Sequence, residues 1–257
     1  MRAIILAAGK GARLNGTAGD EPKCLAKAGR MTLIERQIHT LRSFGIDRIA
    51  VVVGFGADLV RRVCGPDVEY VENNIFDRTN SLYSLWLARD MLRDGFVVLN
   101  SDVLLHPQLL ADLLTAQYED ALLISYRDPA TELGDEEMKV RVRAGRVADI
   151  SKTMDPEEAD GENVGVVKFG AAGAKLLIEQ MDALLAVGGL RFWAPRAFFE
   201  VARRRPLYAI GTRGLPWIEI DFPEDYRRAV EEVLPRIIAL GGEPESFRAV
   251  TAATGGD

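Results

Sequence analysis

The chain has 257 residues, 48% of them hydrophobic and 27% charged, an ordinary composition for a globular protein. Its formal net charge of −6 argues against a general nucleic-acid-binding protein, which would carry a basic face. With two cysteines and two histidines, neither a disulfide framework nor a Cys/His metal cluster is expected. No apolar run approaches the roughly 20 residues of a membrane span, and a strand pattern begins at the N-terminus without a signal peptide. We therefore expect a cytoplasmic protein.

Strand and helix patterns alternate along the first half of the chain. Short runs rich in Val and Ile, without polar alternation, predict buried parallel strands over residues 3–7, 48–53, 96–100 and 121–125. Helical periodicity lies between or after them, over residues 32–44, 57–63, 81–92 and 107–118. Strands separated by helices predict a right-handed, doubly wound sheet.

The second half has a mixed pattern. Residues 139–150 alternate around Gly145 and predict a hairpin, and further strands are expected over 163–170, 207–210 and 216–221. Helices are expected over 171–186, 192–202 and 223–240, and residues 241–257 form a loose tail. The prediction is one α/β domain over residues 1–240 with a mostly parallel central sheet. Helices cover both faces, and an antiparallel portion is added at the edge of the sheet.

The stretch LAAGKGARL follows the first expected strand and indicates a phosphate site. A dinucleotide fingerprint would need a glycine at Leu14. A P-loop needs Ser or Thr after its Gly-Lys pair, but Gly11 follows here. What remains is a loop with backbone N–H groups, two cations in Lys10 and Arg13, and a third cation in Lys23. This set suits a triphosphate. A tight turn with solvated basic residues is the alternative.

Three carboxylates predict a metal site. Asp102 follows the strand over 96–100, at the edge where ligands bind in open α/β sheets. Glu219 and Asp221 are two positions apart, so on a strand they share a face. Mg²⁺ that accompanies a triphosphate is held by one or two carboxylates. The alternatives are that Asp102 or Asp221 caps the following helix and that Glu219 is a solvated edge residue.

At this point the motifs resemble a known family. LAAGKGARL followed by PKCL resembles the signature of the sugar-phosphate nucleotidyltransferases, the MobA-like NTP transferase fold. TNSLYSLWLA, LNSDVLL and LPWIEIDFPEDY are similar to the bacterial choline-phosphate cytidylyltransferase branch, which includes aminoethylphosphonate and inositol-phosphate cytidylyltransferases. The resemblance covers residues 1–235 and implies a Rossmann-like nucleotidyltransferase fold.

The resemblance also implies roles for individual residues. The nucleotide would be held by the loop residues Leu6, Ala7, Ala8, Gly9, Lys10 and Gly11. Arg13 and Lys23 would bind its α- and β-phosphates and stabilise the transition state. Asp102 and Asp221 would hold Mg²⁺, with Glu219 as a weaker candidate.

Two further sites follow from the same resemblance. Asn80 and Ser81 lie where the family contacts the nucleotide, although Asn80 is also a good N-cap. Lys152 lies where related hexose-phosphate enzymes place a lysine on the acceptor phosphate.

The implied reaction is a cytidylyl transfer. The acceptor oxygen is already anionic, so it would attack the α-phosphorus of CTP without a general base and release pyrophosphate. A choline head would need an aromatic cage, for which Trp217 is the first candidate, with Trp193 and Tyr83 as others. Glu162 adds acidic character that suits choline, an amine or a polyol such as inositol.

Several alternatives stay open. The acceptor could be 2-aminoethylphosphonate or inositol 1-phosphate, and a related enzyme would use a hexose 1-phosphate with UTP or dTTP. A non-enzymatic nucleotide-binding protein would be expected to lack at least one of Arg13, Lys23, Asp102 and Asp221. CTP is chosen on the resemblance alone. The sequence leaves the oligomeric state open, with a homodimer as one option.

Overall fold

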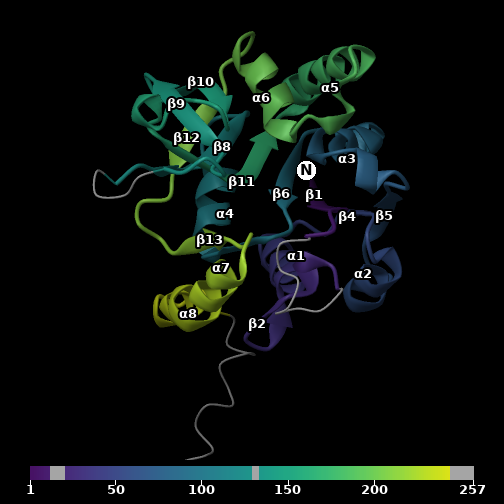
Figure 1. The fold of residues 1–257 in the computed structure, drawn as a ribbon, viewed down its shortest axis with the longest axis vertical. Coiled ribbons are helices and arrows are strands. Elements are labelled where there is room, and N and C mark those ends of the chain that lie inside the picture. The colour runs from purple at the N-terminus through teal and green to yellow at the C-terminus, as the bar shows by residue number, and fades with distance from the viewer. Residues whose placement is uncertain (12–20, 129–132, 244–257) are drawn as a thin grey trace, which may run out of the picture.

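The computed structural model describes residues 1–11, 21–128 and 133–243 (Figure 1). A nine-stranded sheet forms its centre, in the order β5-β4-β1-β6-β11-β8-β12-β10-β9. The first four strands of this order are mutually parallel: β5 (Glu69–Glu72), β4 (Ile49–Val53), β1 (Arg2–Ala7) and β6 (Phe96–Asn100). Their carboxyl ends therefore meet at one edge.

The remaining strands make the sheet mixed. They are β11 (Gly161–Phe169), β8 (Ala121–Tyr126), β12 (Tyr208–Gly211), β10 (Arg146–Ser151) and β9 (Lys139–Arg143). β11 is antiparallel to both β6 and β8, whereas β12 runs parallel to β8. The predicted α/β fold with a parallel sheet and an antiparallel portion is confirmed. The antiparallel portion was expected at the edge of the sheet but begins inside it, because β11 lies between β6 and β8.

Helices cover both faces of the sheet (Figure 1). One face packs against α1 (Leu33–Ser43), α2 (Ala57–Cys64) and α4 (Pro107–Thr115), and the other against α3 (Ser81–Leu87), α5 (Ala171–Ala186) and α6 (Ala194–Ala202). The strand period of two explains this arrangement. Ile4 and Ile5 are neighbours in β1, both fully buried, and each belongs to a different one of the two cores.

A third, smaller core lies beside α1. It joins β7 (Val103–Leu105) and β13 (Trp217–Glu219) to α7 (Pro223–Arg228), a π-helical turn (Ala229–Val233) and α8 (Leu234–Ala239). The short β2 (Lys27–Ala28), which pairs with β3 (Met31–Thr32), also contributes to it. The single helix expected over residues 223–240 is thus interrupted. Figure 1 shows α7 and α8 beside α1 and β2.

Some predicted boundaries and elements differ from the structure. The helix expected over 81–92 ends at Leu87 and is followed by a 3₁₀ turn (Arg89–Met91). The helix expected over 107–118 ends at Thr115. The tail expected from residue 241 is packed at its start, since Glu243 is buried and lies 2.9 Å from Arg36. Residues 244–257 of that tail lie outside the described residues.

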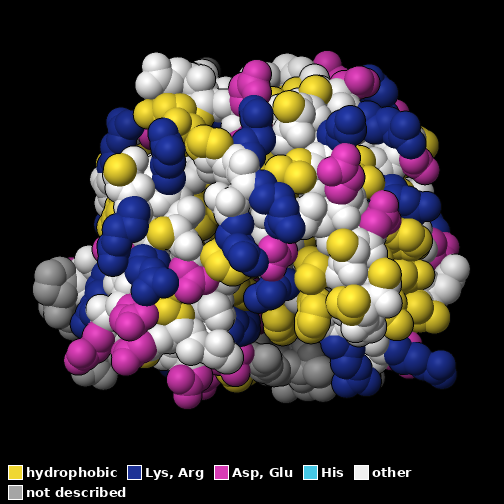
Figure 2. Space-filling view, turned by 90° about the horizontal axis from the view of Figure 1, so that it is seen from above, with side chains coloured by type: hydrophobic (Ala, Val, Ile, Leu, Met, Phe, Trp, Pro, Cys, Tyr) yellow, Lys and Arg dark blue, Asp and Glu magenta, His cyan; other side chains and the backbone are white. Residues whose placement is uncertain are grey.

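The outer face above α5, α6 and the β9–β10 hairpin carries charges of both signs, with apolar atoms gathered at its lower right (Figure 2). On α6 the buried carboxylate of Glu200 contacts Arg196, Arg203 and Arg204 at 3.0, 3.3 and 3.1 Å. These arginines neutralise an internal charge, so they form a structural cluster. Within the part of the chain that the structure describes, no helix is both long and apolar enough to cross a membrane.

Candidate active site

A cleft of about 340 Å³ opens at the carboxyl edge of the parallel strands. Its walls come from several parts of the chain. They include the end of β1 with its glycine loop, the segment from Asn73 to Ser84, and the more distant residues Glu136, Lys152 and Trp193. Lys23, Asp102, Glu219 and Asp221 also line it. Several of the predicted site residues therefore share one cavity, which the sequence could not show.

The glycine loop lines the cleft through Leu6, Ala7, Ala8, Gly9 and Gly11. Gly11 has φ +60, and a Cβ added there would lie 2.6 Å from Lys23 Cβ. A glycine at this position therefore lets Lys23 pass close to the loop.

The other cations of the loop are placed differently. Lys10 is not among the lining residues, because its ammonium lies 5.5 Å over the Phe55 ring. Arg13 and Leu14 lie outside the described residues, so the role predicted for Arg13 stays a prediction.

Lys23 lies between two of the predicted carboxylates. Its Nζ donates to Asp221 Oδ1 at 2.6 Å and to Asp102 Oδ2 at 2.9 Å. Burial alone would lower the pKa of Lys23, but the two carboxylates outweigh it, and the pKa is raised. Lys23 is therefore held as a cation inside the cleft.

The pairing of β7 with β13 brings the two aspartates together. The strands are antiparallel, with Val103 opposite Glu219, and the backbone N–H of Ile220 donates to the carbonyl of Asp102 at 3.0 Å. Asp102 precedes β7 and Asp221 follows β13, so both lie at the same end of this ribbon. Ile218 and Ile220 are buried in the third core, as the strand alternation predicts.

Helix capping does not explain either aspartate. The N-cap of α4 is His106, whose Nδ1 accepts from the Gln108 amide at 3.1 Å. At the start of α7 it is Asp225 that accepts, from the amides of Phe222 and Asp221 at 2.9 and 3.1 Å. The capping alternatives for Asp102 and Asp221 are therefore wrong.

Glu219 is not a solvated edge residue. Burial raises its pKa to about 8, and repulsion from Asp102 and Asp221 adds to this. Around Lys23 the cleft thus holds three neighbouring carboxyl groups, and Glu219 carries a proton at neutral pH more readily than an exposed glutamate.

The residues predicted for the nucleotide lie in the cleft and also hold its wall together. Asn80 caps α3, since its Oδ1 accepts from the Ser81 amide at 2.8 Å. Ser81 Oγ accepts from the Ala194 amide at 2.8 Å, which ties α3 to α6. Both side chains still line the cleft.

Sequence reasoning missed several polar lining residues. Asn73 is buried, and its Nδ2 donates to Thr79 Oγ1 at 2.9 Å and to Ser84 Oγ at 3.1 Å. This network shapes the wall beside Asn80. Asn73 follows β5, a strand that the sequence analysis did not predict, so its position gave no signal. Other lining residues not predicted are Phe76, Asn100, Ser101, Met138, Asn163 and Pro195.

Two of the predicted acceptor residues meet in the cleft. Lys152 Nζ lies 4.7 Å over the Trp193 ring and 3.3 Å from Glu136 Oε2. The backbone of Lys152 is itself anchored, because the buried Lys139 ammonium donates to its carbonyl oxygen at 2.8 Å.

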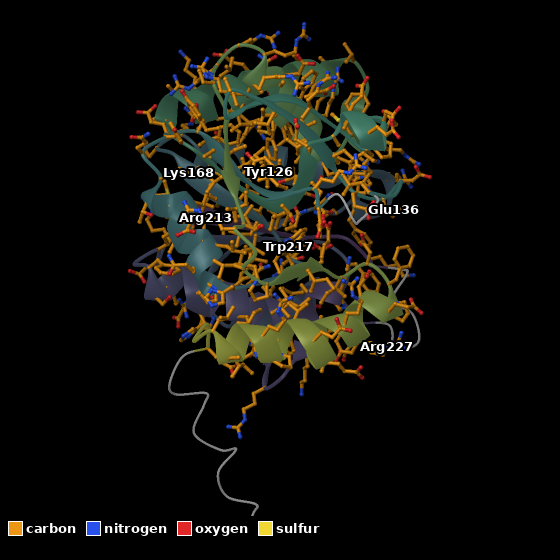
Figure 3. All side chains as sticks on the ribbon, turned by 90° about the vertical axis from the view of Figure 1, so that its left-hand side faces the viewer. Tyr126, Glu136, Lys168, Arg213, Trp217 and Arg227 are labelled. Carbon is orange, nitrogen blue, oxygen red and sulfur yellow. The ribbon has the colours of Figure 1, made fainter. Side chains whose placement is uncertain are left out.

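The other predicted acceptor residues lie outside the cleft lining. Trp217 packs against the core on the α1, α2 and α4 face of the sheet. It also pairs with Leu105 across the β7–β13 ribbon. Figure 3 shows it well separated from Glu136. Tyr83 stacks on Trp86 with ring centroids 5.5 Å apart. For Glu162, burial and then Glu137 raise the pKa to about 7. An aromatic cage built on Trp217 and Tyr83 is therefore not formed at this cleft.

The donor set at the centre of the cleft fits a divalent cation. Asp102 Oδ1 is buried and has no hydrogen-bond partner among the described residues. A carboxylate oxygen left in this state suits a cation ligand. Within residues 1–11, 21–128 and 133–243 no group of three or more His, Cys, Asp or Glu is arranged around a common metal position. Two carboxylates suffice for Mg²⁺ when substrate phosphates complete its coordination.

Comparison with known proteins identifies the family of the chain. The model of the MobA-like NTP transferase domain matches residues 3–194. A bifunctional IPC transferase and DIPP synthase of Rubrobacter xylanophilus is 32% identical over 237 residues; the match covers 90% of this chain but only 52% of that protein. This chain thus spans about half of that relative's length. A choline-phosphate cytidylyltransferase of Streptococcus pneumoniae is 28% identical over 248 residues, covering 91% of this chain and 98% of the relative.

The fold agrees as well. The solved structure of CTP:phosphocholine cytidylyltransferase from Streptococcus pneumoniae superposes with a TM-score of 0.71 at 25% identity, covering 90% of this chain and 97% of that one. The protein is thus an enzyme of the nucleotidyltransferase class. Within that class, the chain belongs to the MobA-like NTP transferase family.

Proposed function

We propose that the protein is a cytidylyltransferase that transfers CMP from CTP to a small phosphate or phosphonate acceptor and releases pyrophosphate. The observation that carries the proposal is the meeting of the glycine loop, Lys23, Asp102 and Asp221 in one cleft. Choline phosphate is the acceptor named from the sequence, with 2-aminoethylphosphonate and inositol 1-phosphate as alternatives. The Streptococcus pneumoniae relative is named a choline-phosphate cytidylyltransferase, which supports the choice of CTP.

The reaction needs charge neutralisation more than acid–base chemistry. An anionic oxygen of the acceptor forms a bond to the α-phosphorus of CTP, while the bond to the bridging oxygen breaks and its electron pair leaves with pyrophosphate. The loop with Gly9 and Gly11 supplies backbone N–H donors for the phosphates. Lys23 places a buried positive charge beside the loop and stabilises charge that develops on the leaving group.

A divalent cation has a defined place in this proposal. Asp102 and Asp221 would hold Mg²⁺. Glu219 is close enough to both that their charges raise its pKa. When bound, Mg²⁺ supplies positive charge to the reacting phosphates. Arg13 is proposed to bind the phosphates from the part of the loop outside the described residues.

The test is pyrophosphate release with Mg²⁺, in which CTP, UTP and dTTP are crossed with choline phosphate, 2-aminoethylphosphonate, inositol 1-phosphate and glucose 1-phosphate. Release with CTP and any of the first three acceptors supports the proposal. Release only with UTP or dTTP and the sugar phosphate would show a hexose-1-phosphate nucleotidyltransferase instead. Asp102→Asn is the negative control, since it removes a negative charge from the cation site while it keeps the side-chain volume.

A further inference from the structure

The Trp193 ring is the aromatic face in the cleft that could bind a cationic head, and the Lys152 ammonium already lies over it. Lys152 Nζ lies 4.7 Å over the Trp193 ring, within the distance at which an ammonium is attracted to an aromatic face. The same ammonium lies 3.3 Å from Glu136 Oε2. The buried Lys139 donates to the Lys152 carbonyl, so the backbone from which this side chain extends is anchored in the fold.

The other aromatic side chains near the cleft are used elsewhere. Among the described residues that line it, the aromatic ones are Trp193 and Phe76, and Phe76 packs edge-on against Phe55 beside the glycine loop. Trp86 lies outside the lining, and Arg89 covers its face at 3.8 Å. By sequence, residues 12–20 and 129–132 contain no aromatic residue, and residues 244–257 contain only Phe247.

A quaternary ammonium is bound by several aromatic faces at once. Here one face is available, and the lysine that occupies it would repel a second cation. Glu136 already contacts the Lys152 ammonium, so an incoming cation could pair with this carboxylate only in competition with Lys152. The same pair offers a donor and an acceptor 3.3 Å apart, and Asn163 adds an amide on the cleft wall. Such groups match hydroxyls rather than a positive charge.

We infer that Lys152, seated on Trp193, is a specificity-determining residue that excludes acceptors with a cationic head, so that the cleft takes phosphorylated acceptors with an uncharged, hydroxyl-bearing head. The inference rests on the proposed function, because it concerns which acceptor that reaction uses. It selects the polyol acceptors over choline phosphate and 2-aminoethylphosphonate.

The experiment measures kcat/KM with CTP and, separately, binding by calorimetry, using inositol 1-phosphate, choline phosphate and 2-aminoethylphosphonate. The wild-type protein should prefer inositol 1-phosphate by about 100-fold in both measurements. Equal or better binding or turnover of choline phosphate would overturn the inference and leave cytidylyl transfer intact. If no nucleotide and acceptor pair reacts but inositol 1-phosphate is still the tighter ligand, the proposed function fails and the inference stands.

Variants at Lys152 separate a specificity role from a structural one. Lys152→Met uncovers Trp193 and should shift the ratio of choline phosphate to inositol 1-phosphate binding toward choline phosphate by about tenfold or more. Lys152→Arg keeps a cation over the ring and should keep the wild-type ratio. Lys175→Met, an exposed position on α5, is the matched control. An unchanged ratio in Lys152→Met, with wild-type thermal stability, would overturn the role of Lys152.

Discussion

Lys23 and Asp221 are joined by a 2.6 Å contact between Nζ and Oδ1, although 198 positions separate them in the chain. The Asp102 carboxylate accepts a second hydrogen bond from the same ammonium at 2.9 Å. One buried ammonium thus offsets part of the repulsion between two carboxylates. The arrangement ties the glycine-loop side of the cleft to the β7–β13 ribbon.

Replacing Lys23 should stop turnover without unfolding the protein. Lys23→Met removes the charge that stabilises the leaving group, so we expect kcat to fall by about 10²–10³. Steady-state pyrophosphate release measures the loss, and circular dichroism checks the fold. Lys27→Met, at an exposed position four residues on, is the matched control. A Lys23→Met enzyme with near-normal kcat would show that this charge has no part in the reaction.

The same variant should bind a divalent cation more tightly when nucleotide is absent. In the wild-type protein, Lys23 competes for the oxygens of Asp102 and Asp221. Without its ammonium, the two carboxylates gain a stronger need for a counter-ion. Titration with Mn²⁺ by calorimetry should therefore give a lower Kd for Lys23→Met than for the wild type. A Kd that is higher or unchanged would place the cation away from these carboxylates.

Gly11 and Gly9 should respond differently to alanine. Gly11 has φ +60, and a methyl group added there would lie 2.6 Å from Lys23 Cβ. A methyl group added at Gly9 would have no other atom within 4 Å. Gly11→Ala should lower the free energy of unfolding by more than about 1 kcal/mol. Gly9→Ala should change it by less than about 0.5 kcal/mol. Urea denaturation of both variants checks this, and equal losses would contradict the close approach of Lys23.

Trp217 should matter for stability and not for the acceptor. It pairs with Leu105 and packs against the core below the sheet, outside the cleft lining. Trp217→Ala should therefore cost about 1–3 kcal/mol of unfolding free energy, because a half-buried indole leaves a gap. KM for every acceptor should stay within about twofold of wild type. A selective rise in KM for choline phosphate would return Trp217 to the acceptor site.

Glu162 should make the protein less stable as the pH rises. Burial, and then Glu137, raise its folded-state pKa from 4.5 to about 7. Below pH 4.5 both states keep the proton, so the contribution is fully present there. Between pH 4.5 and about 7, Glu162 is deprotonated in the unfolded chain but keeps its proton in the folded one. The free energy of unfolding therefore falls as the pH rises through this range.

Glu162→Gln should remove this slope. Relative to this variant, the wild type should lose about 2 kcal/mol of unfolding free energy between pH 5 and 8. Denaturation at several pH values tests this, with the exposed Glu157→Gln as the control. Parallel stability curves for the wild type and Glu162→Gln would show that Glu162 ionises normally.

Local pattern was enough for many of the elements. The strand over 96–100 and the helix over 171–186 have the predicted bounds, because hydrophobic period and end residues are properties of a short window. The helix expected over 81–92 ends at Leu87. The strands β5 and β7 were not predicted, because short, half-exposed or edge segments have weak hydrophobic patterns.

The sequence by itself determined the class of site: a glycine loop after a strand, a lysine and strand-end carboxylates, each recognisable from a few neighbouring residues. Only the tertiary structure decided which of these side chains meet. The β7–β13 pairing places Asp102 beside Asp221, and the packing of α6 against α3 places Trp193 in the cleft while Trp217 stays outside. The physical reason is that such contacts join distant parts of the chain, and no local periodicity encodes them.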